Sequence, residues 1–220
     1  MTDAVAGPHP DLREELVSTC RHLAAAGLSP GGSGNVSVRR GSTVLITPTG
    51  SALARVRADE LATCELRPDG DPVVAAGSKP SKELPLHVAV YRAAPAATAV
   101  VHLHSAAATA RACLPPEDGR AALPAYTPYR VMRLGTIPVA AYAPPGSAAL
   151  ADGVRAVAAT APVLLLAGHG PVTWGTSLPA AADLAEELEN AAQVAFLLRG
   201  TAATPLSDED VAALRKPAGA

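Results

Sequence analysis

Short strand-like segments alternate with helical segments along this chain, and some neighbouring strand-like segments are separated only by tight turns. Residues 36–38 and 43–47 flank a turn at Gly41 and Ser42, and residues 60–66 and 72–75 flank Pro68-Asp69-Gly70. Such pairs predict β-hairpins, whose two strands are antiparallel. Because helical segments are interspersed among the strands, the chain is predicted to be an α/β protein with a largely antiparallel sheet covered by helices.

The remaining segments are assigned from their apolar residues and capping signals. Residues 11–26, 82–94, 148–159 and 178–199 are predicted helices, while 98–103, 163–166 and part of 137–142 are predicted strands. Ser81, Ser105, Ser147 and Ser177 each precede a predicted helix and are candidate N-caps. No internal repeat or long linker divides the sequence, so residues 1–220 are expected to form a single domain.

The composition excludes several classes of function. Hydrophobic residues make up 49% of the chain and aromatic residues only 3%, which predicts a core of small aliphatic side chains. The net charge is −2 without a basic cluster, so neither nucleic acid nor an anionic membrane is an expected partner. There is no signal-peptide pattern and no apolar run of membrane-spanning length, and the three cysteines are unpatterned. A cytoplasmic location is therefore expected.

The sharpest local signal is the sequence V-V-H-L-H-S at residues 100–105. Side chains alternate between the two faces of a strand, so His102 and His104 should share a face while Leu103 points into the core. Two imidazoles spaced in this way can bind one cation. Taken alone, the pair is equally compatible with two hydrogen-bonded histidines at the end of a strand.

His169 is the natural third ligand, because it follows the apolar segment A-P-V-L-L-L-A and stands between two glycines. Glycines allow the chain to turn sharply and to approach another element closely. A turn histidine alone is more often structural, but three protein ligands with an open position are typical of catalytic zinc. His102, His104 and His169 are thus the predicted ligands of a divalent metal, with Zn²⁺ favoured.

Three polar segments could together bind an anion: G-G-S-G-N at 31–35, T-P-T-G at 47–50 and P-S-K-E at 80–83. They combine exposed backbone N–H groups with short side chains, and the third stands at a helix start, where the free N–H groups favour an anion. Each segment alone is an ordinary turn or cap. Glu83 is a candidate proton-transfer carboxylate. His87 is four residues further on, on the same helix side, and is interpreted as structural.

With these residues in place, the sequence resembles the class II aldolase/adducin-type family. The resemblance rests on S-G-N-V-S-V-R, I-T-P-T-G, P-S-K-E-L-P-L-H-V-A-V-Y-R-A, A-V-V-H-L-H-S and A-P-V-L-L-L-A-G-H-G-P-V, in this order. It implies a three-layer α/β/α sandwich, a divalent metal on His102, His104 and His169, and a homotetramer with active sites at subunit interfaces. It also implies that Glu83 is the catalytic carboxylate, and that substrate phosphate is bound by Gly34, Asn35, Thr49, Gly50, Ser81 and Lys82.

Within the family, P-S-K-E and L-P-A-Y-T-P-Y-R-V-M-R-L-G-T-I-P-V-A-A-Y-A-P-P-G-S are most similar to the decarboxylases of 3-oxo-tetronate 4-phosphates. The sugar-phosphate aldolases have a serine at position 82, and their tail carries a tyrosine that residues 201–220 lack. Arg130 stands where the decarboxylases tend to carry a second tyrosine. Tyr129 is therefore the tyrosine assigned as an active-site contributor from a neighbouring subunit.

The resemblance implies a lyase that decarboxylates a 3-oxo-tetronate 4-phosphate to dihydroxyacetone phosphate and CO₂ through a metal-bound enediolate. The alternative within the family is a fuculose-phosphate-type aldolase or a pentulose-phosphate 4-epimerase. The alternative of another class is a non-catalytic, adducin-like interaction module, which predicts loss of the metal ligands. All three histidines and Glu83 are present, so this reading is disfavoured.

Overall fold

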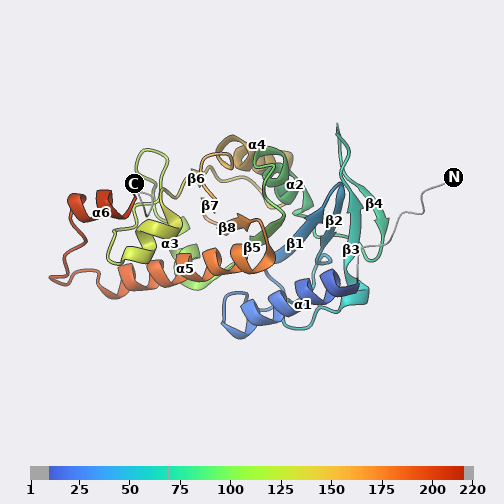
Figure 1. The fold of residues 1–220 in the computed structure, drawn as a ribbon, viewed down its shortest axis with the longest axis horizontal. Helices are drawn as coiled ribbons and strands as arrows, with labels where there is room; N and C mark the ends of the chain where they lie inside the picture. Colours follow the sequence, from blue (N-terminus) through green and yellow to red (C-terminus); the bar gives the residue numbers. More distant parts are fainter. Residues whose placement is uncertain (1–9, 69, 216–220) are drawn as a thin grey trace.

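The computed structural model describes residues 10–68 and 70–215, and it has an eight-stranded sheet between two layers of helices (Figure 1). The strand order is β4-β3-β2-β1-β5-β8-β7-β6, and within the described residues only the pair β6–β7 is parallel. The strands are β1 (Asn35–Arg40), β2 (Thr43–Ile46), β3 (Ala62–Glu65), β4 (Val73–Ala76), β5 (Ala99–His102), β6 (Val139–Ala140), β7 (Val163–Leu166) and β8 (Gly170–Gly175). The predicted α/β/α sandwich with a largely antiparallel sheet is confirmed.

Helices cover both faces of the sheet, as Figure 1 shows. They are α1 (Pro10–Ala25), α2 (Leu84–Ala93), α3 (Ala106–Ala112), α4 (Ala148–Val157), α5 (Leu178–Leu197) and α6 (Asp208–Leu214), with the 3₁₀ turn η1 (Ala58–Glu60) and the π turn η2 (Arg130–Leu134). On one face, α2 and α4 pack together over Val100, Leu164 and Trp174. On the other face, α1 and α5 cover Val36 and Val101. The predicted helices and strands are present, with ends shifted by a few residues.

Two of the four predicted N-caps are confirmed. The hydroxyls of Ser147 and Ser177 accept hydrogen bonds from backbone N–H groups in the first turns of α4 and α5. The helix α2 begins later than predicted, and Ser81 instead accepts a hydrogen bond from the N–H of Glu83. Ser105 precedes α3, but its hydroxyl makes no capping bond.

The buried carboxylate of Glu189 on α5 replaces Ser105 as the cap of α3. Its two oxygens accept hydrogen bonds from the N–H groups of Ala107 at 2.9 Å and Ala108 at 2.8 Å. A carboxylate offers a separate acceptor oxygen to each of the two free N–H groups, so both are satisfied at once. Burial raises the pKa of Glu189, but these hydrogen bonds outweigh burial and hold the pKa below its ordinary value.

Glu189→Gln should therefore destabilise the protein by about 2 kcal/mol, because one of two charge-assisted hydrogen bonds is lost. Since the folded pKa of Glu189 is depressed, its contribution is present above the unfolded pKa and is lost as the pH falls through the folded pKa. Urea unfolding of both proteins at neutral pH and below pH 4 should show the stability difference shrinking in acid. Glu186→Gln, on the same helix, is the control, because Glu186 makes only an exposed pair with His22. A difference that persists unchanged in acid would contradict the prediction.

One helix of the structure was not predicted from the sequence, and one residue of a predicted turn lies outside the described residues. Helix α6 was not predicted, although the capping box formed by Ser207 and Asp210 marks its start. Asp69, in the predicted turn Pro68-Asp69-Gly70, lies outside the described residues, while the strands that flank it pair as β3 and β4. Among the described helices, none is both long and apolar enough to cross a membrane.

Candidate active site

The candidate site is built around His102, the last residue of the central strand β5. Its neighbours across the sheet are Asn35 on β1 and Val172 on β8. Residues directly opposite each other in a sheet project to the same face, so the register places Asn35 beside His102. His104 follows two residues later, and His169 is at the turn between β7 and β8, next to β5. The sheet topology therefore brings together three histidines that are up to 67 residues apart in sequence (169 − 102).

The three imidazoles converge on one point. Their ring centroids are 4.8–5.0 Å apart, and their nearest ligand nitrogens all lie within 4.8 Å of one another. The Nε2 atoms of His102 and His104 are 3.2 Å apart. Two nitrogens bound at about 2.0–2.1 Å to one tetrahedral metal are roughly 3.3 Å apart, so the rings are already spaced for a shared cation.

Protonation also favours metal binding. The Nδ1–H of His102 donates to the carbonyl oxygen of Pro171 at 2.9 Å, which leaves the lone pair of Nε2 facing the other two rings. Burial lowers the pKa of His102 to about 4, and burial likewise lowers the pKa values of His104 and His169. All three rings are therefore neutral near pH 7, which is the form that binds metals. The residues present fit a divalent metal.

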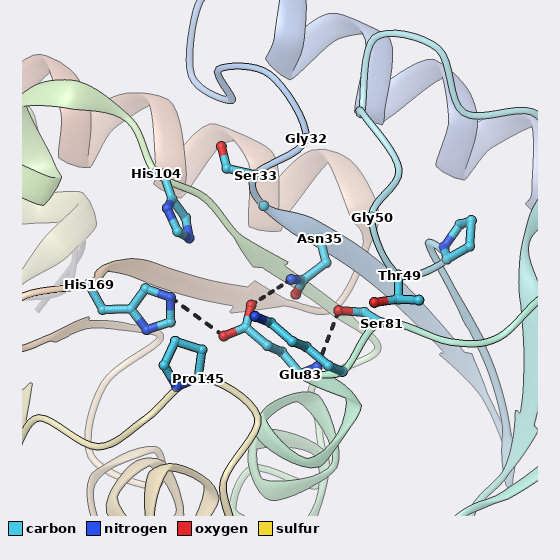
Figure 2. Close-up of a pocket in the computed structure, with 13 residues that line it drawn as sticks. Gly32, Ser33, Asn35, Thr49, Gly50, Ser81, Glu83, His104, Pro145 and His169 are labelled. Carbon is cyan, nitrogen blue, oxygen red and sulfur yellow. Dashed lines mark hydrogen bonds and ion pairs between the residues drawn. The ribbon is translucent and has the colours of Figure 1, made fainter.

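Glu83 lies beside the three histidines, immediately before α2. Its Oε2 is 3.4 Å from Nε2 of His102, and its Oε1 is 3.5 Å from Nε2 of His169. Burial raises the pKa of Glu83, but His102 and the hydrogen bond from Asn35 outweigh burial, so the pKa lies below its ordinary value. Oε1 is buried and has no hydrogen-bond partner among the described residues. One oxygen of the carboxylate, Oε2, therefore accepts a hydrogen bond from Asn35, while Oε1 is free of hydrogen bonds from the described residues and faces His169 (Figure 2).

A polar cleft opens above this carboxylate, as Figure 2 shows. It is lined by the glycine-rich turn before β1, the turn at residues 48–50, the segment before α2, and two of the histidines. Gly34 has φ +79°, and a Cβ there would meet the carbonyl oxygen of His102 and Oγ of Ser29, each at 3.0 Å. Only glycine allows the turn to approach β5 this closely. Ser81 is buried at the base, whereas Thr49, Gly50 and Lys82 are exposed.

The structure brings nearly all of the predicted site residues to this one place. The cleft is lined by Gly34, Asn35, Thr49, Gly50, Ser81, Lys82, Glu83, His104 and His169, with His102 directly beneath. It is also lined by Gly32, Ser33 and Pro145, which the sequence analysis did not assign. The first two belong to the same G-G-S-G-N segment, so that segment was the available signal. Pro145 lies in the segment at residues 123–147 that resembles the decarboxylases, but nothing in that segment assigned it to the site.

Two residues of the sequence analysis lie elsewhere. Tyr129 is 64% exposed and faces a surface hollow with Arg133 and Asp183, away from the cleft of its own chain. Its assignment to a neighbouring subunit's site stays a prediction. Arg130, half-buried, donates from Nε to the carbonyl oxygen of Leu123 at 3.0 Å and from its guanidinium to that of Gly135. These hydrogen bonds connect the loop at Leu123, before η2, with Gly135, directly after η2.

Comparisons with known proteins agree with this geometry. Residues 14–196 match the family model described as Class II Aldolase and Adducin N-terminal domain. A 3-oxo-tetronate 4-phosphate decarboxylase from Pectobacterium atrosepticum is 39% identical over 214 residues, which are 97% of this chain and 96% of that protein.

Solved structures show the same likeness. The structure of YgbL from Klebsiella pneumoniae superposes with a TM-score of 0.87 at 38% identity, over 93% of this chain and 98% of that one. An L-fuculose 1-phosphate aldolase superposes with a TM-score of 0.83 at 26% identity, over 94% of this chain and 95% of that one. With the family model covering most of its length and its three histidines converging beside a glycine-rich cleft, this chain belongs to the class II aldolase/adducin family.

Proposed function

We propose that this protein is a metal-dependent carbon–carbon lyase that decarboxylates a 3-oxo-tetronate 4-phosphate to dihydroxyacetone phosphate and CO₂. The observation that carries the proposal is the convergence of three neutral imidazoles, one carboxylate with an unpartnered oxygen, and a polar cleft. Relatives named for this activity match over nearly the whole chain, which supports the choice of reaction. The proposal includes zinc as the metal, a homotetrameric assembly to which Tyr129 contributes, and a cytoplasmic location.

The substrate has a carboxylate, a hydroxyl, a ketone and a phosphate on four successive carbons. His102, His104 and His169 would hold the metal, which when bound supplies a Lewis acid for the oxygens of the ketone and hydroxyl. The bond between the carboxylate carbon and the hydroxyl-bearing carbon breaks, and its electron pair stays on the hydroxyl-bearing carbon, delocalised onto the ketone. That carbon then accepts a proton, which yields dihydroxyacetone phosphate.

Glu83 is proposed to move this proton. It stands within 3.5 Å of two of the three ring nitrogens, and its Oε1 is not held by a hydrogen bond from the described residues. The lowered pKa leaves Glu83 ionised near pH 7, so its carboxylate first takes up the proton of the substrate hydroxyl and then gives this proton to the hydroxyl-bearing carbon after CO₂ has left. The hydroxyl oxygen regains a proton from solvent as the product leaves. Asn35 donates one N–H to Glu83, which leaves its second N–H for the phosphate or the substrate.

The second candidate function is that of an aldolase. In that reaction a carbon–carbon bond breaks to release an aldehyde instead of CO₂, and the electron pair again stays on the hydroxyl-bearing carbon next to the ketone. The structural likeness to an L-fuculose 1-phosphate aldolase favours keeping it. The deciding experiment supplies both configurations of the hydroxyl-bearing carbon of 3-oxo-tetronate 4-phosphate, and fuculose 1-phosphate in parallel. Release of CO₂ with dihydroxyacetone phosphate from the first substrate is expected. Aldehyde release from the second, without CO₂ from the first, would refute the decarboxylase.

Lys82 is proposed to bind the substrate phosphate as a point charge. It is exposed at the rim of the cleft, next to the helix start. Lys82→Ser should weaken the binding of dihydroxyacetone phosphate about tenfold, or roughly 1.4 kcal/mol, and leave that of dihydroxyacetone unchanged. Titration calorimetry on both ligands measures this directly. Lys79→Ser is the control, since Lys79 is also exposed but does not line the cleft. Equal losses for the two ligands would refute the role.

A further inference from the structure

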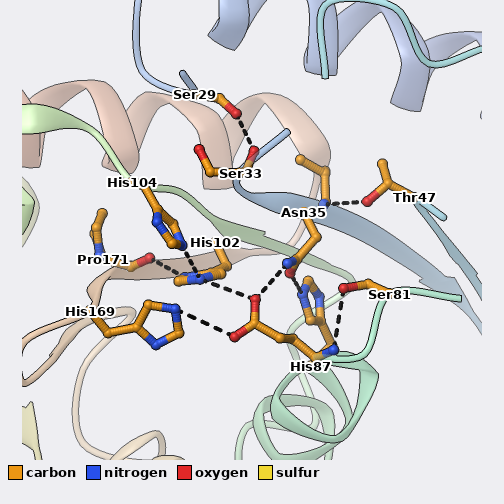
Figure 3. A network of polar contacts seen from close by, with 12 residues as sticks. Ser29, Ser33, Asn35, Thr47, Ser81, His87, His102, His104, His169 and Pro171 are labelled. Atoms are coloured by element: carbon orange, nitrogen blue, oxygen red, sulfur yellow. Dashed lines mark hydrogen bonds and ion pairs between the residues drawn. The ribbon is translucent and has the colours of Figure 1, made fainter. Parts of the chain in front are cut away.

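A line of hydrogen bonds runs away from Glu83 into the core between α2 and β1, and Figure 3 shows its part at Asn35 and His87. Asn35 Nδ2 donates to Oε2 of Glu83 at 2.8 Å, and Asn35 Oδ1 is 2.5 Å from Nε2 of His87. Nδ1 of His87 is 2.7 Å from Oγ of Ser37, which is 2.7 Å from the hydroxyl of Tyr91. All five side chains are at most 5% exposed, so water does not compete for these bonds.

The arrangement follows from matched periodicities. Glu83, immediately before α2, and His87 and Tyr91 on α2 are spaced by four residues, which is about 6 Å along a helix. On β1, Asn35 and Ser37 are spaced by two residues, which is about 6.6 Å along a strand. The helix and the strand run in the same direction, so each polar residue of α2 meets a polar residue of β1.

The donor and the acceptor of each hydrogen bond in the line can be assigned by starting from the Glu83 carboxylate. A carboxylate only accepts, so the amide of Asn35 must turn its N–H toward Glu83 and its oxygen toward His87. Nε2 of His87 must therefore carry a proton and donate. Nδ1 then accepts from the Ser37 hydroxyl, whose oxygen accepts from Tyr91.

Resting on the function proposed above, we infer that His87 is a positioning residue for Glu83 and acts through the amide of Asn35. The N–H of His87 opposes rotation of this amide, because a rotated amide would place its NH₂ group, also a donor, against that N–H and its oxygen against the Glu83 carboxylate. The result is that Oε2 is fixed while Oε1, the unpartnered oxygen, stays aimed at the metal ligands. Packing alone does not require an imidazole here, since an apolar side chain would fill the same space without two buried nitrogens to satisfy.

A matched pair of variants tests this inference. The amide nitrogen of glutamine can replace Nε2 of histidine and donate to Asn35, whereas the shorter asparagine reaches only the place of Nδ1. Both variants lose the imidazole and its packing. We expect His87→Gln to keep kcat within about threefold of the wild type and His87→Asn to lose about 10–100-fold, the range for groups that orient an active-site residue. KM and metal content should stay close to wild type in both.

Two further measurements do not depend on activity. Crystal structures should show Asn35 and Glu83 in place in His87→Gln and displaced in His87→Asn. Nitrogen-15 spectra of histidine-labelled protein should show the His87 ring neutral, with its proton on Nε2. Three results would each overturn the inference. The first is equal kcat values in the two variants when their melting temperatures and metal contents are also equal. The second is an unmoved Glu83 in the crystal structure of His87→Asn, and the third is a His87 proton on Nδ1.

These measurements separate this inference from the proposed function. If the wild type releases no CO₂ but cleaves a ketose phosphate, the decarboxylase fails and the two variants are compared on that cleavage. If the wild type has neither activity, the crystal structures and the nitrogen-15 spectra decide the role of His87 by themselves.

Discussion

Glu83→Gln is expected to lower kcat by about 10²–10⁴-fold, the usual contribution of a positioned general acid or base. An amide has nearly the shape of a carboxyl group but cannot carry the transferred proton. Its oxygen can still accept the hydrogen bond from Asn35, so the cleft should keep its shape. The metal content should stay at the wild-type level, since the proposed metal ligands are the three histidines and not Glu83.

The measurement is single-turnover release of CO₂ together with elemental analysis of the purified variant. Glu15→Gln is a suitable control, because Glu15 is exposed on α1 and does not line the cleft. Unchanged turnover in Glu83→Gln would exclude Glu83 as the proton donor and leave the metal assignment standing.

His102→Ala is expected to remove the metal and all measurable turnover. His102 is fully buried, and its ring lies next to both other imidazoles. After its removal only His104 and His169 remain, and two imidazoles bind a metal more weakly than three. Metal affinity should fall by more than about 100-fold, beyond the 10–100-fold seen when only an outer partner of a ligand is removed. His169→Ala should behave in the same way.

Elemental analysis, turnover and circular dichroism of the variants check this expectation, with His22→Ala as the control. His22 is an exposed histidine that pairs with Glu186 on the surface, so its loss should leave metal content and turnover unchanged. The fold should survive in His102→Ala, because the sheet is held by its ladder and its apolar faces. Full activity in a metal-free His104→Ala protein would refute the metal site.

The proximity of His102 and His104 could be predicted from the sequence because the alternation of side chains is a local property. An extended segment places residues two apart on one face whatever the rest of the chain does. The partnership of Glu83 with Asn35 could not be derived in this way, because the two residues are 48 positions apart and meet only when α2 packs on β1. For the same reason, the sequence alone indicates only a structural role for His87.

Other differences have equally specific causes. Ser105 has the right type and place for a cap, but Glu189 reaches α3 from α5, a contact across 82 residues that no local pattern encodes. The role predicted for Tyr129 concerns contact with a second subunit, which the structure of one chain does not test. The hairpins and long helices were recognised because turn chemistry and apolar periodicity act over a few residues.

Burial changes sharply across the cleft. Asn35, Glu83 and His102 are at most 5% exposed, whereas Thr49 and Lys82 at the rim are exposed. Exposed substitutions usually change stability by within about 0.5 kcal/mol. A directed-evolution library restricted to positions 49 and 82 would therefore sample new substrate preferences from a population of folded, metal-competent proteins.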